Sequence, residues 1–161
     1  MINDVSASLA AVAAEAGVAW AAMHMLGDPK TMQVDPHYDD VVTEVAGFLS
    51  EGAAQARALG VDEVWIDPGI GFGKTLDHNL RLLAHLDRLA DLGFPLLVGT
   101  SRKSSLGRLL ADSDGSAEAP PPEDRLEASL ATATWAMVRG ARMVRVHDVL
   151  PTVQAAKVVA A

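Results

Sequence analysis

Three short segments combine residue types that could bind a ligand and stabilise charge: Asp67–Lys74, Thr100–Lys103 and Arg145–His147. Each follows an apolar run of the kind that forms a buried strand. Together they supply a carboxylate, several glycines, cationic side chains and a histidine. The chemistry of the protein is therefore predicted to lie where strands end.

The first segment lies within Val64–Thr75, which predicts a strand, a glycine-rich turn and then a helix. Glycines let the backbone approach a ligand closely, and the free N–H groups of the next helix attract an anion. The run is similar to a Walker A loop, but Pro68 stands where that loop has its first glycine. Proline has no N–H and cannot adopt positive φ, which argues against a nucleoside-triphosphate site.

Asp67 stands between the predicted buried strand and this loop. An isolated Asp-Pro-Gly more often forms a plain turn or a helix cap. The neighbouring glycines favour a functional carboxylate, which would accept hydrogen bonds from N–H groups of a ligand.

The other two segments carry cations. Arg102 and Lys103 lie at a predicted helix start, where positive charge opposes the helix dipole, so they indicate an anionic or electron-rich ligand. A solvated charged turn is the alternative. Arg145 and His147 share one face of a strand and could clamp a phosphate or stabilise a leaving anion, although such a pair alone is more often surface decoration.

Strand-like and helix-like runs alternate along the chain, which predicts an α/β fold built from five strand-helix units. The five strands are predicted from apolar runs that end at Ile2, Met25, Ile66, Val98 and Val146. Helical spacing of apolar residues predicts helices over Leu9–Ala16, Tyr38–Leu59, Asn79–Leu92, Arg125–Arg139 and Thr152–Val159. Left-handed caps are expected at Gly17, Gly60, Gly93 and Gly140. Residues 112–124, with three consecutive prolines, are predicted to form a flexible, non-helical insertion.

Composition narrows the class of protein. The 161 residues suit a single domain, and a net charge of −8 argues against nucleic-acid binding through a broad basic surface. No cysteine is present, no apolar run reaches the length of a membrane span, and the first residues do not resemble a signal peptide, so a cytoplasmic protein is expected. No His-Glu-x-x-His or related spacing predicts a zinc site built by this chain alone.

Several runs, in order along the chain, closely resemble the dihydropteroate synthase family. They are Ile2–Val5, Met23–Met25 with Gly27–Gln33, Asp67–Thr75, Gly99–Ser104 and Arg145–Asp148. The resemblance implies a partial (β/α)₈ TIM barrel, with residues 1–161 as one incomplete pterin-binding domain whose five units correspond to strands 4 to 8. On this basis the first three strands are expected to be absent from this sequence.

Members of this family are transferases of folate biosynthesis and targets of sulfonamides. They condense 6-hydroxymethyl-7,8-dihydropterin pyrophosphate with para-aminobenzoate, and so release pyrophosphate and form 7,8-dihydropteroate. The resemblance implies that the pterin is bound by Asn3, Met23, Asp67, Lys103 and Arg145. It further implies that Gly71, Phe72 and Ser104 contact the aminobenzoate, that Arg145 and His147 hold the pyrophosphate, and that Lys103, Arg145 and His147 are the catalytic residues.

The resemblance also implies Mg²⁺ as cofactor, bound by an asparagine in the N-terminal part that this sequence lacks. We therefore expect little or no synthase activity from this chain alone. Two unpaired strand edges, at Ile2 and Val146, predict a homo-oligomer or a partner fragment that covers them. Two alternatives remain open: a doubly wound, non-catalytic binding module, and a pseudoenzyme that binds pterin or phosphate without catalysis.

Overall fold

The chain forms an α/β fold, which a computed structural model describes over residues 1–161. The strands are β1 (Ile2–Asp4), β2 (Trp20–Met23), β3 (Val64–Asp67), β4 (Leu97–Val98) and β5 (Met143–Val144). The helices are α1 (Ala10–Ala16), α2 (Val41–Ala58), α3 (Leu76–Ala84), α4 (Leu86–Ala90), α5 (Ser104–Asp114), α6 (Leu126–Val138) and α7 (Val149–Val159), with a 3₁₀ turn η1 (Pro122–Asp124) between α5 and α6. The predicted strand-helix alternation is confirmed. None of the helices combines the length and apolar content that crossing a membrane requires.

All strand pairs are parallel and follow the order of the chain. One sheet has the order β1-β2-β3, and a second sheet pairs β4 with β5. A single parallel bridge between Ile66 and Leu96 joins the two sheets. A doubly wound sheet needs a point where the strand order reverses, and this order has none. The carboxyl ends of all five strands therefore lie along one edge, where the predicted site residues follow them.

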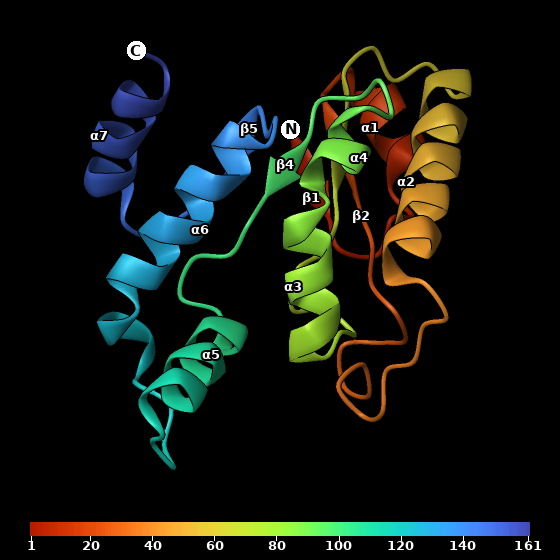
Figure 1. Cartoon of the computed structure of the whole chain (residues 1–161). Helices are drawn as coiled ribbons and strands as arrows, with labels where there is room; N and C mark the ends of the chain where they lie inside the picture. The colour runs from red at the N-terminus through yellow and green to blue at the C-terminus, as the bar shows by residue number, and fades with distance from the viewer.

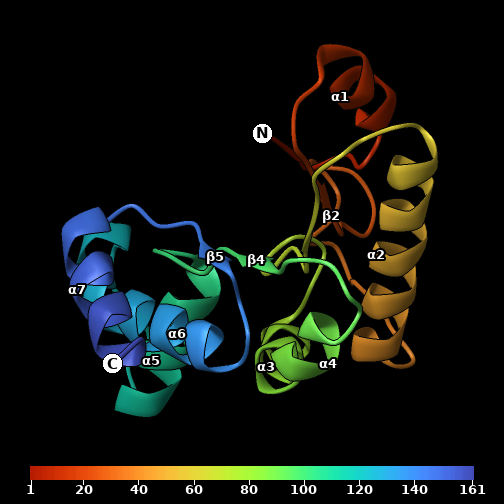
Figure 2. The ribbon, with the colours of Figure 1, turned by 90° about the horizontal axis from the view of Figure 1, so that it is seen from above.

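The helices form two groups on either side of the strands (Figures 1 and 2). Helices α1 to α4 lie beside β1, β2 and β3, while α5, α6 and α7 gather beyond β4 and β5. The apolar stripe of α2, at helical spacing, is buried in the core and consists of Val41, Val42, Val45, Leu49, Ala53 and Ala56. This group carries most of the hydrophobic core, so it gives β2 and β3 a rigid support.

Helix α7 is less well covered. Only Thr152 of this helix is buried, whereas Leu150 is 71% exposed and Val158 is 78% exposed. An apolar hollow of about 410 Å³ lies between Met1 on one side and β5 with α7 on the other. The outer strand β1 pairs only with β2, and β5 pairs only with β4. Both outer strands therefore keep an unpaired edge.

Element boundaries differ from the predicted ones mainly at strand ends. Strand β1 begins at Ile2 rather than ending there, and β2 and β5 end two residues before the predicted Met25 and Val146. The predicted helix over residues 79–92 is two helices that meet at His85. The expected glycine caps are confirmed at Gly17, Gly60 and Gly140, which have positive φ and donate their N–H groups to the last turn of a helix. Gly93 also has positive φ, but it lies three residues after α4 ends at Ala90 and does not cap that helix.

The prolines of residues 112–124 predict a non-helical segment, and this prediction is wrong for parts of it. Helix α5 continues to Asp114 and ends at Gly115 in a left-handed conformation, and η1 begins at Pro122, since proline is tolerated in a first turn. The buried Arg125 donates to the Pro120 carbonyl through Nε and Nη2, at 2.8 and 2.6 Å. This contact ties the proline run to the start of α6.

The buried carboxylate of Asp4 joins β1 to its neighbours. It accepts hydrogen bonds from the Ser6 N–H and hydroxyl, from the Leu9 N–H at 2.7 Å and from Trp20 Nε1 at 3.1 Å. Although burial acts in the opposite direction, these hydrogen bonds hold the pKa of Asp4 below its usual value. A carboxylate whose folded pKa is lowered stabilises the fold above its unfolded pKa, and that stability is lost as the pH falls through the folded pKa.

We predict that Asp4→Ala lowers the free energy of unfolding by about 2–3 kcal/mol, because the buried N–H groups of Leu9 and Trp20 lose their acceptor. Urea denaturation at pH 7 measures this loss. When the measurement is repeated toward pH 3, the difference in free energy of unfolding between variant and parent should become smaller. Asp39→Ala is the control, since Asp39 is fully exposed. Equal effects of the two substitutions would contradict the role of Asp4.

Candidate functional site

The buried carboxylate of Asp67 lies at the centre of the strand-end edge. Asp67 is the last residue of β3 and accepts a hydrogen bond from the Gly69 N–H at 2.9 Å. Asn3, on β1, points its amide nitrogen at the other carboxylate oxygen at 3.5 Å. Met23 lies on β2, between β1 and β3; it pairs in register with Asp67 and is almost fully buried. Three of the predicted pterin-binding residues are therefore brought together.

Two cations from the segments that follow β4 and β5 act on Asp67. Burial raises the pKa of Asp67, while the Gly69 N–H and the charges of Lys103 and Arg145 oppose that rise. Burial lowers the pKa of Lys103 to about 8, with Asp67 opposing the shift and Arg145 adding to it. The charges of Asp67, Lys103 and Arg145 are coupled, because each of them shifts the pKa of at least one of the others. The predicted grouping of Asp67, Lys103 and Arg145 is thus present.

The loop from Gly69 to Gly73 is held by side chains that bind its carbonyl oxygens. Lys74 Nζ donates to Gly69 at 3.1 Å and to Phe72 at 3.0 Å. Lys103 Nζ donates to Ile70, Gln33 donates to Gly71 at 2.6 Å, and the Tyr38 hydroxyl donates to Gly73 at 2.8 Å. All five consecutive carbonyls therefore have a side-chain donor. Such a loop is rigid without regular secondary structure.

Two glycines let this loop pack against the backbone that follows β2. A Cβ on Gly69 would lie 1.9 Å from the His24 carbonyl oxygen, and one on Gly73 would lie 2.4 Å from that of Leu26. Both residues also have positive φ, at 62° and 63°. The glycine-rich pattern therefore serves loop packing as well as access to a ligand.

The loops after β4 and β5 are joined by two polar contacts. Ser101 Oγ lies 3.0 Å from His147 Nδ1 and accepts a hydrogen bond from the His147 N–H at 3.1 Å. Arg102 binds Asp148 through two nitrogens, at 3.0 and 2.6 Å. Arg102 also has a left-handed backbone with φ of 58°, which costs energy for a residue with a side chain. The Arg102 charge predicted to attract an anion is thus largely engaged within the chain.

Arg145 and His147 are exposed and face the same hollow as Lys103. The Arg145 guanidinium lies close to Gly99, where an added Cβ would come within 3.2 Å of Nη2. The hollow has a volume of about 340 Å³, and its lining includes Phe72, Ser101, Lys103, Arg145 and His147. Phe72 places its ring 4.8 Å from Lys103 Nζ, in a cation–π contact. The hollow has cationic walls and one aromatic side.

Ser104 lies apart from this hollow. It is the first residue of α5, is exposed, and lines a small depression of about 30 Å³ with Gly71, Gln33 and Arg108. Gly71 thus borders the depression beside Ser104, while Phe72 contacts Lys103. The three predicted aminobenzoate residues border one continuous edge of the loop after β3.

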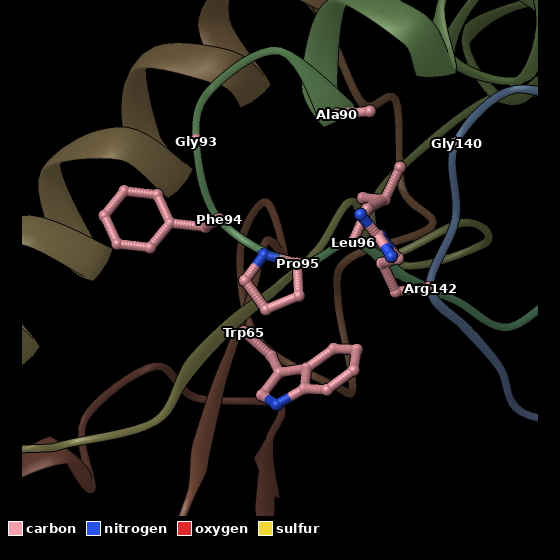
Figure 3. Close-up of a pocket in the computed structure, with 8 residues that line it drawn as sticks. All are labelled: Trp65, Ala90, Gly93, Phe94, Pro95, Leu96, Gly140 and Arg142. Carbon is pink, nitrogen blue, oxygen red and sulfur yellow. The ribbon is translucent and has the colours of Figure 1, made fainter.

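The largest cavity lies at the opposite ends of the strands (Figure 3). It measures about 520 Å³ and is lined by Trp65, Pro95, Leu96 and Arg142, among others. Trp65 and Pro95 face each other across it, while Phe94 points away. These residues precede or begin their strands, whereas the predicted site residues follow them. We place the candidate site by its chemistry rather than by cavity size, because the strand-end hollow alone holds the coupled charges.

Several contacts in the site were not predicted from the sequence. Lys74, His24, Ser101, Asp148, Gln33 and Asn79 had no assigned role, yet all bind the loops that carry predicted residues. All of them except Asn79 lie within runs that carry the family resemblance, and this is the one signal that points to them. No group of three or more His, Asp or Glu side chains is arranged to hold a metal ion.

Comparisons with known proteins identify close relatives. The pattern of the family described as "Pterin binding enzyme" matches residues 1–147. Dihydropteroate synthase of Neisseria meningitidis serogroup C is 44% identical over 98% of this chain and 56% of its own length. That of Escherichia coli strain K12 is 46% identical over 92% of this chain and 51% of its own length. The chain thus spans about half the length of the curated relatives it matches.

Solved structures agree with these relatives. Dihydropteroate synthase of Thermus thermophilus in complex with 6HMPPP superposes with a TM-score of 0.88 at 43% identity, over 98% of this chain and 62% of that one. The Yersinia pestis enzyme in a sulfonamide drug complex gives a TM-score of 0.89 at 41% identity, over 99% and 57%. Another Thermus structure holds 4-aminobenzoate, with a TM-score of 0.84 at 44% identity over 94% and 60%.

We predict that Gly69→Ala destabilises the chain by about 2–4 kcal/mol more than Gly17→Ala. The two glycines have nearly equal φ, at 62° and 63°, but an added Cβ meets the His24 backbone only at Gly69. Gly17→Ala therefore measures the cost of the left-handed backbone alone, and the difference measures the steric clash. Chemical denaturation of both variants makes the comparison, and equal losses would show that the loop can move away.

We also predict that Asp67→Asn lowers the pKa of Lys103 below about 8 and the pKa of Lys74 below about 7, because the Asp67 charge raises both. NMR titration of ¹³C-labelled lysine side chains measures the two values. A pKa of Lys103 that stays constant or rises would contradict the electrostatic coupling.

Proposed function

Because the chain belongs to the pterin binding enzyme family, we propose that it carries one side of a dihydropteroate synthase site. The reaction joins 6-hydroxymethyl-7,8-dihydropterin pyrophosphate to para-aminobenzoate and yields 7,8-dihydropteroate and pyrophosphate in folate biosynthesis. The observation that carries the proposal is the buried Asp67 carboxylate, which meets Asn3 and the charges of Lys103 and Arg145 at the strand ends. The Thermus and Yersinia structures with 6HMPPP, 4-aminobenzoate and a sulfonamide drug add support.

In this proposal the pterin lies against Asp67. A pterin ring presents N–H groups and an amino group along one edge, and the free lone pairs of the Asp67 carboxylate would accept them. Asn3 would add a donor and an acceptor, and the Lys103 amine would reach the carbonyl oxygen of the ring. Met23 would form the apolar floor. A buried carboxylate beside two cations stays available as an acceptor, because the cations oppose its protonation.

The aminobenzoate would lie along the outer edge of the loop after β3. Gly71 and Phe72 would border its ring, and Ser104 would bind its carboxylate with the free N–H groups at the start of α5. Side-chain hydrogen bonds to the carbonyls of Gly71 and Phe72 fix this edge. The amine nitrogen of the substrate would then be directed toward the hollow that holds Lys103.

Arg145 and His147 would hold the pyrophosphate as it departs. The bond between the pterin methylene carbon and the bridging oxygen breaks, and its electron pair leaves with the pyrophosphate. The lone pair of the aromatic amine forms the new C–N bond, and the amine then releases a proton to solvent. Positive charge near the departing oxygens lowers the barrier, because negative charge grows there. Ser101 would orient the His147 ring through the contact at Nδ1.

We also propose Mg²⁺ as the cofactor of the complete reaction, in line with the family resemblance. The described residues do not fit such a site, since Asp148 is engaged by Arg102 and no cluster of ligands surrounds His147. No step above passes through the metal.

The arrangement of the strands supports a further part of the proposal. Five parallel strands in chain order, with helices outside, are what a segment of a (β/α)₈ barrel would show. The unpaired edges of β1 and β5 and the exposed apolar side chains of α7 would then be covered by a second copy or by a partner fragment.

Calorimetric titration with a pterin analogue tests the proposed site. We expect binding to the parent chain and a loss of about tenfold to a hundredfold in affinity for Asp67→Asn, which removes a charge-assisted acceptor. Asp77→Asn is the matched control, because Asp77 is exposed on α3 and pairs only with Arg81. Absence of pterin binding by the folded parent would exclude the proposal. Pterin binding without any affinity for 4-aminobenzoate would favour a non-catalytic pterin-binding module.

Light scattering tests the proposed association. At micromolar concentration we expect particles heavier than the 16.9 kDa of one chain. Leu150→Lys, at an exposed apolar position of α7, should shift the population toward monomers, while Val34→Lys, on the exposed loop after β2, should leave it unchanged. A monodisperse monomer for the parent chain would contradict this part of the proposal.

A further inference from the structure

Lys74 is a buried amine to which none of the proposed substrate contacts assigns a role. Only 3% of its surface is exposed, although the residue lies at the end of the glycine-rich loop. Lysine is almost never buried without a charged partner, yet no carboxylate lies within hydrogen-bond distance of this amine. Its surroundings therefore need a separate explanation.

The amine is enclosed by acceptors from two loops. His24 Nδ1 lies 2.9 Å away, the Phe72 carbonyl oxygen 3.0 Å and the Gly69 carbonyl oxygen 3.1 Å, with the His24 carbonyl at 3.4 Å. An ammonium group has three N–H donors, so the three nearest acceptors can each receive one. Burial, with the Lys74 charge adding, lowers the pKa of His24 to about 3, which keeps its ring neutral and its Nδ1 free to accept.

The position of these acceptors relates Lys74 to both sides of the proposed site. The Gly69 N–H donates to the Asp67 carboxylate, at the proposed pterin position. The Phe72 ring contacts Lys103, beside the proposed aminobenzoate position. His24 follows Met23 at the end of β2 and packs edge-on against Phe48 of α2, with ring centroids 5.0 Å apart. The Lys74 amine thus links the glycine-rich loop of the site to the rigid core.

We propose that Lys74 is a positioning residue: its amine fixes the Gly69–Phe72 backbone against His24 and so holds Phe72 where the aminobenzoate must bind. This inference rests on the proposed function of the loop. Lys74 touches no substrate in this role and acts through the carbonyl oxygens of Gly69 and Phe72.

The energetics of burial support this role. Burial lowers the pKa of Lys74 to about 7, against the attraction of Asp67 and with the repulsion of Lys103. An apolar side chain of similar length would avoid that desolvation cost, but it would leave the Phe72 carbonyl oxygen without its donor, while the Gly69 carbonyl would keep only the Phe72 N–H. The amine is therefore suited to fixing the loop rather than to adding hydrophobic stability.

The test compares two side chains at position 74 that differ only in the presence of the terminal amine. The chain has no cysteine, so Lys74→Cys introduces a single thiol. Alkylation of the unfolded chain with 2-bromoethylamine rebuilds a side chain with a terminal amine, in which sulfur replaces one methylene. Alkylation with 1-iodopropane gives a side chain of nearly the same length without the amine. The two derivatives, once refolded, differ only at the terminal group.

Two measurements are made on both derivatives and on the parent chain. Calorimetry gives the affinity for 4-aminobenzoate and for a pterin analogue. Fluorine NMR with 4-fluorophenylalanine reports on the three phenylalanines, which Phe72→Leu assigns. Phe94, near the far cavity, serves as the internal control.

We expect the aminoethyl derivative to match the parent. In the propyl derivative, the Phe72 resonance should shift or broaden while that of Phe94 stays unchanged. This derivative should also bind 4-aminobenzoate at least about tenfold more weakly than the aminoethyl derivative does. The loss of pterin affinity should be smaller, because Asp67, Asn3 and Lys103 keep their own positions. If the propyl derivative does not fold, Lys74→Gln, which keeps an amide donor, takes its place.

An unshifted Phe72 resonance together with 4-aminobenzoate affinity within about twofold of the aminoethyl derivative overturns the proposal. Failure of both the propyl derivative and Lys74→Gln to fold also overturns it, because Lys74 would then act on stability alone. A parent chain that binds no 4-aminobenzoate would exclude the proposed function, and the Phe72 resonance would still decide the role of Lys74.

Discussion

The site depends on one constraint: the backbone between β3 and α3 must satisfy its polar groups without forming a helix or a strand. Five consecutive carbonyls, from Gly69 to Gly73, each receive a side-chain donor. The donors come from the loop after β2, from the loop after β4 and from Lys74 itself. Because a buried carbonyl without a donor is costly, this loop keeps its shape only when all of these segments are in place. The site is therefore assembled by the tertiary fold rather than carried by one motif.

The charges of the site are arranged around the same loop. The chain as a whole has a net charge of −8, yet Lys74, Lys103 and Arg145 gather near the buried carboxylate of Asp67. Burial penalises the charged forms of Asp67, Lys74 and Lys103, and the attraction between opposite charges compensates in part. A local excess of positive charge in an acidic chain attracts an anion to one place without making the whole surface basic. This arrangement fits a small anionic ligand better than it fits nucleic acid.

The strand order, rather than the size of a cavity, determines where the site lies. Parallel strands in chain order place Asn3, Asp67, Lys103 and Arg145 along one edge, while the largest cavity opens at the other ends of the strands. The rigid group of α1 to α4 supports β2 and β3, and the less covered group of α5 to α7 supports the cations. The two halves meet through the Ile66–Leu96 bridge and through side-chain contacts such as Trp135 Nε1 with the Leu83 carbonyl and Lys103 Nζ with the Ile70 carbonyl. The geometry between Asp67 and Lys103 depends on all of these contacts.

Local interactions could be predicted from the sequence, and long-range contacts could not. Strand-helix alternation and most of the glycine caps depend on neighbouring residues, so periodicity and residue type were enough to predict them. The end of α5 at Asp114 was missed because the prolines further along predicted a non-helical segment from residue 112 on. The family resemblance, not the spacing, supplied the roles of Asn3 and Ser104, whereas strand spacing already paired His147 with Arg145. Only the tertiary structure decided that Lys74 binds His24, 50 positions away, and that Arg102 binds Asp148 rather than a ligand, 46 positions away. Such pairs depend on how the strands align in space, and no local pattern in the sequence records that alignment.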